Sequence, residues 1–167
     1  SAYPEQTVMA YRDPITGNWP DFFTTADLNA LIEIWGAESQ ALDASNNSFV
    51  GSSLSENVAG LMGDDRLNGG GGNDQLNGNE GADWLTGGVG DDQISGGAGA
   101  DTIRLSKGND LIFGFSVIEG DRLELESGMM SSLAVVDGST QLRTILGVTT
   151  LDGLTDLTAV SSAISFV

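Results

Sequence analysis

Residues 60–113 read GLMGDDRLN GGGGNDQLN GNEGADWLT GGVGDDQIS GGAGADTIR LSKGNDLIF, which is six blocks of nine residues without an insertion. Position six is always aspartate, at Asp65, Asp74, Asp83, Asp92, Asp101 and Asp110. Position eight is always a branched aliphatic residue, at Leu67, Leu76, Leu85, Ile94, Ile103 and Ile112. A flexible glycine-rich linker needs neither a strict period nor an aliphatic residue at one phase, so the pattern predicts a regular repeat structure.

The blocks follow the pattern G-G-x-G-x-D-x-U-x, in which U is a large aliphatic residue, and this pattern resembles the nonapeptide repeat of RTX calcium-binding proteins. The resemblance extends over residues 51–113, because the preceding block keeps the phase with Glu56 and Val58. It implies that each nonapeptide forms a six-residue turn and a three-residue strand, and that two nonapeptides form one coil. The expected fold is therefore all-β, a parallel β-roll.

Calcium is the cofactor that the resemblance implies, and the composition of the turns agrees with it. Glycine permits tight turns that expose carbonyl groups, whereas the repeated aspartates repel one another. Calcium takes six to eight oxygen ligands from carboxylates and carbonyls, so it would satisfy both kinds of group. The expected ligands are the aspartate side chains named above and the turn residues Gly60, Met62, Gly63, Gly69, Gly71, Gly72, Gly78, Glu80, Gly81, Gly87, Val89, Gly90, Gly96, Ala98, Gly99, Lys107 and Gly108.

In such a roll, turns on one edge are 18 residues apart. One edge then carries Asp65, Asp83 and Asp101, and the other carries Asp74, Asp92 and Asp110. An ion between successive turns gives two sites on each edge, or about four ions in all. The pairing of Glu56 with Asp74, and of Asp101 with Asp121, offers one further site at either end.

The flanking segments are expected to cap the repeat, because an open solenoid end exposes core and strand edges. Residues 1–50 contain an amphipathic pattern that predicts a helix over about 25–35. Residues 114–167 are predicted to form a β cap, with strands over 120–126, 148–151 and 163–167 and a hairpin over 133–146 that turns at Asp137-Gly138. The apolar ending over 164–167 resembles the C-terminal signal of type I secretion substrates, and a plain terminal strand is the alternative.

The composition excludes several functions. The chain of 167 residues has 24 acidic and 6 basic side chains, a net charge of −18, and no histidine or cysteine. Cysteine nucleophiles, histidine-based triads and zinc sites built on either residue are therefore absent. Binding to nucleic acid through phosphates is disfavoured by the charge, and no apolar run is long enough for a membrane span. The chain itself is not expected to be an enzyme.

A second surface could bind a ligand. Positions seven and nine of each block point outward, so Arg66, Trp84 and Arg104 are expected to lie near one another on one sheet. We consider two interpretations of this face. It binds a polysaccharide, as repeat modules attached to polysaccharide-modifying enzymes do, or Trp84 stacks on arginine or packs under the N-terminal segment.

The resemblance implies a secreted bacterial protein that leaves the cell through a type I secretion apparatus and folds outside, where calcium is abundant. The predicted function is therefore a calcium-binding module that folds on calcium in the extracellular space. The alternatives are a calcium-stabilised module that binds a polysaccharide or a cell surface, and a non-catalytic tail of a secreted enzyme. Because the repeat is shared by proteases, lipases, toxins and adhesins, it does not identify the parent activity.

Overall fold

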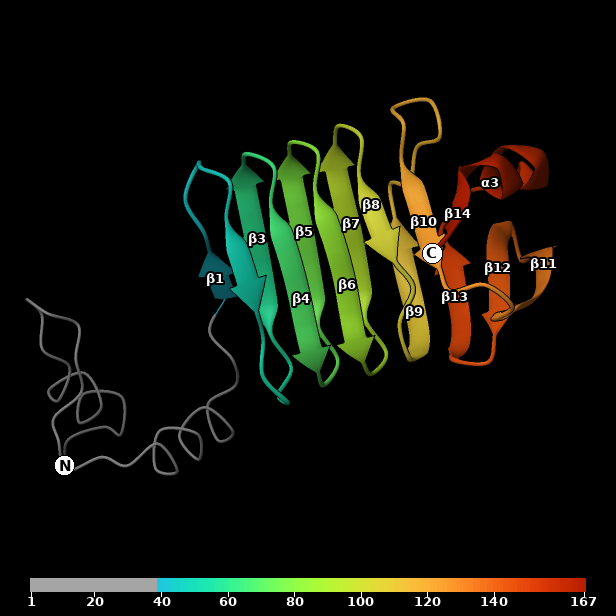
Figure 1. Cartoon of the computed structure of the whole chain (residues 1–167), viewed down its shortest axis with the longest axis horizontal. Coiled ribbons are helices and arrows are strands. Elements are labelled where there is room, and N and C mark those ends of the chain that lie inside the picture. The colour runs from blue at the N-terminus through green and yellow to red at the C-terminus, as the bar shows by residue number, and fades with distance from the viewer. Residues whose placement is uncertain (1–38) are drawn as a thin grey trace, which may run out of the picture. The chain divides into compact units, whose positions relative to one another are not determined.

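The computed structural model describes residues 39–167, and the helix expected over 25–35 lies outside them (Figure 1). The elements are β1 (Ser39–Ala41), β2 (Ser48–Val50), β3 (Asn57–Met62), β4 (Arg66–Gly71), β5 (Gln75–Glu80), β6 (Trp84–Val89), β7 (Gln93–Ala98), β8 (Thr102–Arg104), β9 (Gly108–Phe113), β10 (Arg122–Leu125), β11 (Met130–Val136), β12 (Ser139–Thr144), β13 (Gly147–Leu151), α3 (Leu157–Ala163) and β14 (Ile164–Phe166). The described residues are thus nearly all-β, with one short helix near the C-terminus.

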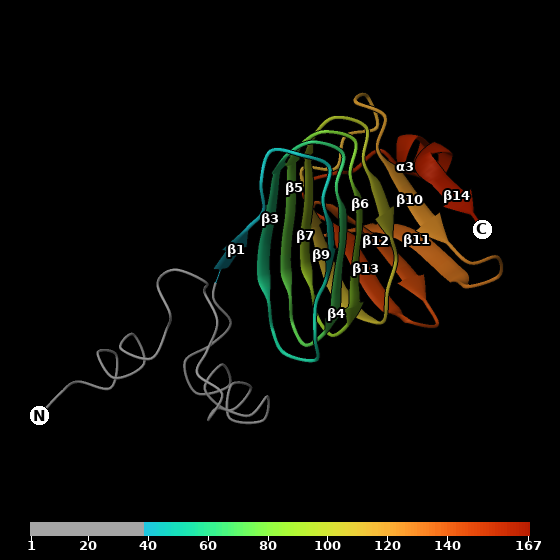
Figure 2. The same ribbon diagram turned by 60° about the vertical axis from the view of Figure 1, so that its left-hand side comes forward.

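From β1 to β10, successive strands alternate between two sheets, as a parallel β-roll requires. The eight-stranded sheet has the order β1-β3-β5-β7-β9-β13-β12-β11, and the six-stranded sheet has the order β14-β10-β8-β6-β4-β2. From β1 to β9, neighbours within a sheet are parallel, and residues 18 apart are partners, as in Leu76 with Ile94. Figure 2 shows the two sheets as facing layers. The expectation of a parallel β-roll is therefore confirmed.

Most strands of the roll contain six residues rather than the three that we expected. In β4 the pairing with β6 includes Arg66 to Asn68 and then continues through Gly70 and Gly71. The first three positions of a block therefore belong to the parallel ladder and not to a free turn. The physical reason is that glycine has no side chain to separate the coils, so these backbones approach closely enough to pair.

The core of the roll contains two facing ladders of aliphatic side chains, which come from position eight of the repeats and from the C-terminal strands that continue them. All of these residues have at most 2% of their surface exposed. The eight-stranded sheet contributes Val58, Leu76, Ile94, Ile112 and Leu151, and the six-stranded sheet contributes Leu67, Leu85, Ile103 and Leu123. Each strand from β3 to β9 therefore contributes one large aliphatic side chain to these ladders, and this thin core leaves the turns without apolar support.

The C-terminal residues extend both sheets. In the six-stranded sheet, β10 continues the register, with Leu123 beside Ile103. In the eight-stranded sheet, β13 adds to β9, with Gly147 beside Gly108 and Thr149 beside Asp110. The strands predicted over 120–126 and 148–151 are therefore confirmed. They do more than cover the end of the roll, because they occupy the places of further coils.

The predicted hairpin is also confirmed. Strands β11 and β12 are antiparallel, with Val136 opposite Ser139. The two residues between them, Asp137 and Gly138, have φ values of 51° and 83°. Positive φ at both positions is the signature of a tight hairpin turn whose twist matches the strands.

Helix α3 was not predicted from the sequence. Its N-cap is Asp156, whose carboxylate accepts hydrogen bonds from the backbone N–H groups of Thr158 and Ala159, both at 3.0 Å. Val160 and Ala163 are its buried residues. The strand predicted over 163–167 begins one residue later and is shorter, because this helix occupies Ala163. No helix in the described residues is long and apolar enough to cross a membrane.

Candidate metal centre

The position-six aspartates form two columns, one along each edge of the roll. Each aspartate is at most 3% exposed. One oxygen of each carboxylate, Oδ1, accepts a hydrogen bond from a backbone N–H group of the preceding coil. Asp83 accepts from the N–H of Asp65 at 2.7 Å, and Asp92 accepts from the N–H of Asp74 at 2.8 Å. The carboxylates therefore connect successive coils through one oxygen only.

The second oxygen of these carboxylates is buried and has no hydrogen-bond partner. This holds for Asp65, Asp74, Asp83, Asp92 and Asp101, and for Oε2 of Glu56. A buried carboxylate oxygen without a partner is costly, because it has lost its water and gained nothing in exchange. These six oxygens recur at one position of successive repeats, and carboxylate oxygens are ligands that hard cations prefer. They are therefore candidate cation ligands.

The surroundings of these oxygens suit a hard cation. Each lies beside the first glycine of its own repeat. A Cβ atom added at Gly60 would overlap Asp65 Oδ2 and would lie 2.7 Å from the carbonyl oxygen of Gly78 in the next coil. At Gly69 the added atom would overlap Asp74 Oδ2 and would lie 2.6 Å from the carbonyl oxygen of Gly87. Carboxylate and carbonyl oxygens thus converge on a space that only glycine leaves open, and the residues fit calcium.

The last carboxylates of the two columns, unlike the preceding ones, have hydrogen-bond partners for both oxygens. At the last repeat, Ser106 Oγ lies 3.1 Å from Asp110 Oδ2 and donates to it. After the repeat, Asp121 Oδ2 accepts the N–H of Ser116 at 2.7 Å, while its Oδ1 accepts the N–H of Asp101 at 3.0 Å. The protein therefore satisfies these two carboxylates itself, whereas it leaves the preceding ones unsatisfied.

Acidic side chains do not cluster around a common point. In residues 39–167 no group of three acidic side chains is close enough together to hold a metal ion. Most ligands would therefore have to be backbone carbonyls. The carbonyls of Glu80, Val89, Ala98 and Lys107 each accept one N–H of the preceding coil at 2.9–3.0 Å. A carbonyl oxygen has two lone pairs, so such a bond leaves room for a further interaction.

The family comparison agrees with this geometry. The family model for the RTX calcium-binding nonapeptide repeat, which spans four copies, matches residues 50–85, 59–94 and 77–112. The chain carries RTX repeats. These repeats are calcium-binding and non-catalytic, and they are typical of secreted bacterial proteins.

Two solved structures with similar folds are subunits of the mannuronan C5-epimerase of Azotobacter vinelandii. The AlgE6R2 subunit is 26% identical, with a TM-score of 0.47, and the match covers 78% of this chain and 94% of that one. The AlgE6R3 subunit is also 26% identical, with a TM-score of 0.37, and the match covers 78% and 84% of the two chains. No curated protein matches the sequence of this chain significantly.

Burial raises the pKa values of several RTX aspartates, because it removes the water that stabilises their charge. The pKa of Asp74 rises to about 7, and those of Asp101 and Asp110 rise to about 6. The pKa values of Asp83 and Asp92 also rise, again mainly through burial. At neutral pH the charged form of these groups therefore opposes folding unless a cation compensates for it.

A pH dependence follows for the calcium-free chain. Between about pH 4 and 7 the folded chain holds more protons than the unfolded chain, so folding without calcium is favoured at low pH and disfavoured as the pH rises through 6 to 7. We expect circular dichroism of the calcium-free chain to show more β structure at about pH 4.5 than at about pH 7.5. Equal spectra at the two pH values would contradict this prediction.

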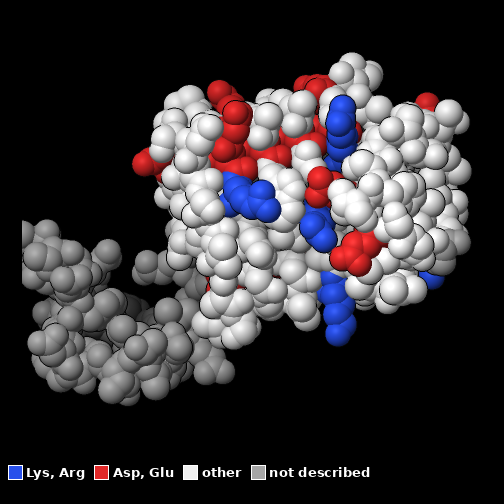
Figure 3. Space-filling view, in the orientation of Figure 1, with Lys and Arg blue, Asp and Glu red and all other residues white. Residues whose placement is uncertain are grey.

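The predicted ligand face is on the outer side of the six-stranded sheet, where its members have partners within the chain. The guanidinium of Arg66 lies 4.0 Å from the ring centre of Trp84, so the arginine–tryptophan stack is present. Trp84 Nε1 donates to Glu124 Oε2 at 3.3 Å, and Arg104 forms an ion pair with Glu126 at 3.4 Å. Figure 3 shows basic side chains standing apart, with acidic ones among them. Polysaccharide binding by this face stays a prediction.

Proposed function

We propose that this RTX module binds calcium and folds because it binds calcium, in the extracellular space and as part of a type I secreted protein. The observation that carries the proposal is the set of six buried carboxylate oxygens without partners. A bound cation would give each of these oxygens the partner that the protein does not supply. When a site exists only in the folded chain, the free energy of metal binding becomes free energy of folding.

The surroundings of these oxygens support a count of about four ions. In four repeats the unpartnered oxygen and a glycine carbonyl of the next coil both lie close to the first glycine, at Gly51, Gly60, Gly69 and Gly78. These positions favour four ions, one of which would use Glu56 as a ligand. At Gly87 and Gly96 the atoms nearest to an added Cβ belong to Asp92 and Asp101. Four ions would change the net charge from −18 to about −10.

The extracellular assignment is supported by the energetics of the fold. Sites of extracellular modules bind calcium with dissociation constants of about 10⁻⁴ to 10⁻³ M, so they stay empty where calcium is scarce. A thin core and repeated carboxylates give little stability without the ion. Such a chain would stay unfolded inside the cell, where it could pass a type I secretion apparatus, and would fold outside.

The neighbouring residues Asp64 and Asp65 provide a matched test. In the parent chain the N–H of Asn47 donates to Asp65 Oδ1 at 2.7 Å. Asp65→Asn keeps an oxygen that can accept this hydrogen bond, but it removes the negative charge of the carboxylate whose Oδ2 is buried. Asp64→Asn removes the same charge from an exposed carboxylate, whose Oδ1 accepts the N–H of Ala82 at 2.9 Å. We expect Asp65→Asn to raise the calcium concentration at the folding midpoint about tenfold, and Asp64→Asn to change it less than about twofold.

The measurement is circular dichroism during a calcium titration of the two variants and the parent chain. Equal midpoints for Asp65→Asn and Asp64→Asn would count against the proposal, because the buried carboxylate would then have no special role in binding the ion.

A further inference from the structure

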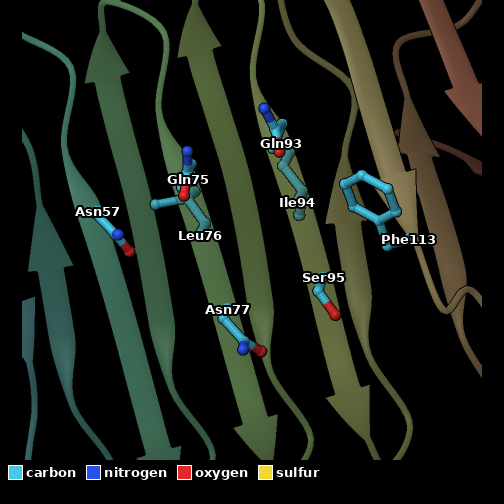
Figure 4. Close-up of a pocket in the computed structure, with 8 residues that line it drawn as sticks. All are labelled: Asn57, Gln75, Leu76, Asn77, Gln93, Ile94, Ser95 and Phe113. Atoms are coloured by element: carbon cyan, nitrogen blue, oxygen red, sulfur yellow. The ribbon is translucent and has the colours of Figure 1, made fainter. Parts of the chain in front are cut away.

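The outer face of the eight-stranded sheet carries a shallow groove of about 200 Å³ that calcium binding does not explain. It lies over β3, β5, β7 and β9, and Figure 4 shows its lining side chains. The side chains that project into it come from positions seven and nine of the repeats: Asn57, Gln75, Asn77, Gln93, Ser95 and Phe113. All are uncharged in a chain whose net charge is −18.

The amide groups of this face have unused hydrogen-bonding capacity. Asn57, Gln75 and Gln93 are register partners and form one row across three strands. A second row contains Asn77, Ser95 and Phe113. The four amide side chains are exposed, and within residues 39–167 no hydrogen bond reaches any of them. Each amide offers both a donor and an acceptor, as required for binding a hydroxyl group.

Phe113 gives the groove an aromatic wall at one end. The ring is half-buried and stands beside Ile94 and Ser95 (Figure 4). A half-buried aromatic face next to free amides is suited to a ligand that is apolar on one face and rich in hydroxyl groups at its rim. A sugar ring has this character. Neighbouring side chains within a row are about 4.8 Å apart, because they lie on adjacent strands. This spacing is similar to the length of one hexose in an extended sugar chain.

We propose that this groove binds a neutral oligosaccharide, with successive sugars over successive strands and one ring against Phe113. The absence of charge in both rows decides the ligand class. An anionic polysaccharide would find no cation in this groove and would be repelled by the acidic roll. A second copy of the chain would bring two molecules of net charge −18 together, which costs free energy that a neutral sugar avoids.

This binding site goes beyond calcium-driven folding and lies on the sheet opposite the Arg66 and Trp84 face. The test uses the full chain in millimolar calcium, after circular dichroism has shown that each variant is folded. The ligands are hexasaccharides of β-1,4-glucose, β-1,4-mannose, β-1,4-xylose and α-1,4-glucose, with hexagalacturonate as the anionic comparison, and binding is measured by titration calorimetry.

We expect at least one neutral hexasaccharide to bind, and hexagalacturonate to bind more weakly. Phe113→Ala and Gln93→Ala should each weaken the binding about tenfold. The control is Thr102→Ala, because Thr102 occupies the same repeat position as Gln93 on the other sheet. This variant should bind within about twofold of the parent chain.

Three results would overturn the proposal. They are the absence of binding to every neutral sugar, binding that Phe113→Ala and Gln93→Ala leave unchanged, and stronger binding of hexagalacturonate. Sedimentation of the same samples adds a fourth, since a dimer that Gln93→Ala dissociates would make the groove an interface between two copies. None of these results depends on whether calcium drives folding, so the two proposals can fail separately.

Discussion

Chelation of calcium at neutral pH is expected to abolish most of the β-sheet signal of the RTX repeats, and added calcium is expected to restore it. Without the cation, the buried carboxylates of both edges each have an oxygen without a partner, and burial, with neighbouring carboxylates, raises the pKa values of Asp74 and Asp101. The core offers one aliphatic side chain per strand in compensation. Circular dichroism during a calcium titration should therefore show a cooperative transition, at a calcium concentration of about 10⁻⁴ to 10⁻³ M.

Magnesium is the appropriate control for this titration. It requires a small octahedral set of ligands and keeps several of its waters, whereas the roll offers single carboxylates together with backbone carbonyls in positions that the coils fix. We expect no comparable rise in β signal at equal magnesium concentrations. A chain that is fully folded in chelator would contradict the prediction, and it would mean that the aliphatic ladders and the C-terminal strands suffice alone.

The roll could be predicted from the sequence because its rule is local and repeated. An aliphatic residue at every ninth position predicts one inward side chain per repeat, and the resemblance to RTX repeats, which places two blocks in each coil, assigns the fixed aspartates to two edges. The hairpin at Asp137-Gly138 was equally clear, since two residues that tolerate positive φ stand between two apolar runs. In each case the residues that determine the structure are neighbours in the sequence.

Other features depend on distant residues and could not be predicted in this way. The coil after Gly108 is completed by Gly147, beyond the inserted hairpin, so the register returns 39 residues later rather than 18. Nothing in the nine-residue pattern marks that return. Likewise, the pattern shows that aspartate is needed at position six, but not that one oxygen holds a backbone N–H group while the other is left unpartnered. Asp156 is the N-cap of α3, but the residues around it are also typical of a strand, so the helix was not predicted from the sequence.

Gly90→Ala is expected to prevent folding at any calcium concentration. Gly90 has a φ of +143°, and a Cβ atom there would overlap the carbonyl oxygen of Gly72 in the preceding coil. The same overlap would occur between Gly108 and Gly90, so the position-four glycines form a closely stacked column along this edge. Coils about 4.8 Å apart cannot separate to admit a methyl group without breaking the parallel ladder on both sides.

Gly153→Ala is the matched control for this substitution. Gly153 also has a positive φ, +68°, but nothing lies within 4 Å of an added Cβ atom. Gly153→Ala should therefore lose only about 1–2 kcal/mol of folding free energy, from the positive φ, and should still fold in calcium. Calcium titrations of both variants, followed by circular dichroism, compare a crowded positive-φ glycine with an uncrowded one. If Gly90→Ala folded as readily as Gly153→Ala, the coils would not be close-packed at this column, and the carbonyls would not be held where a shared cation needs them.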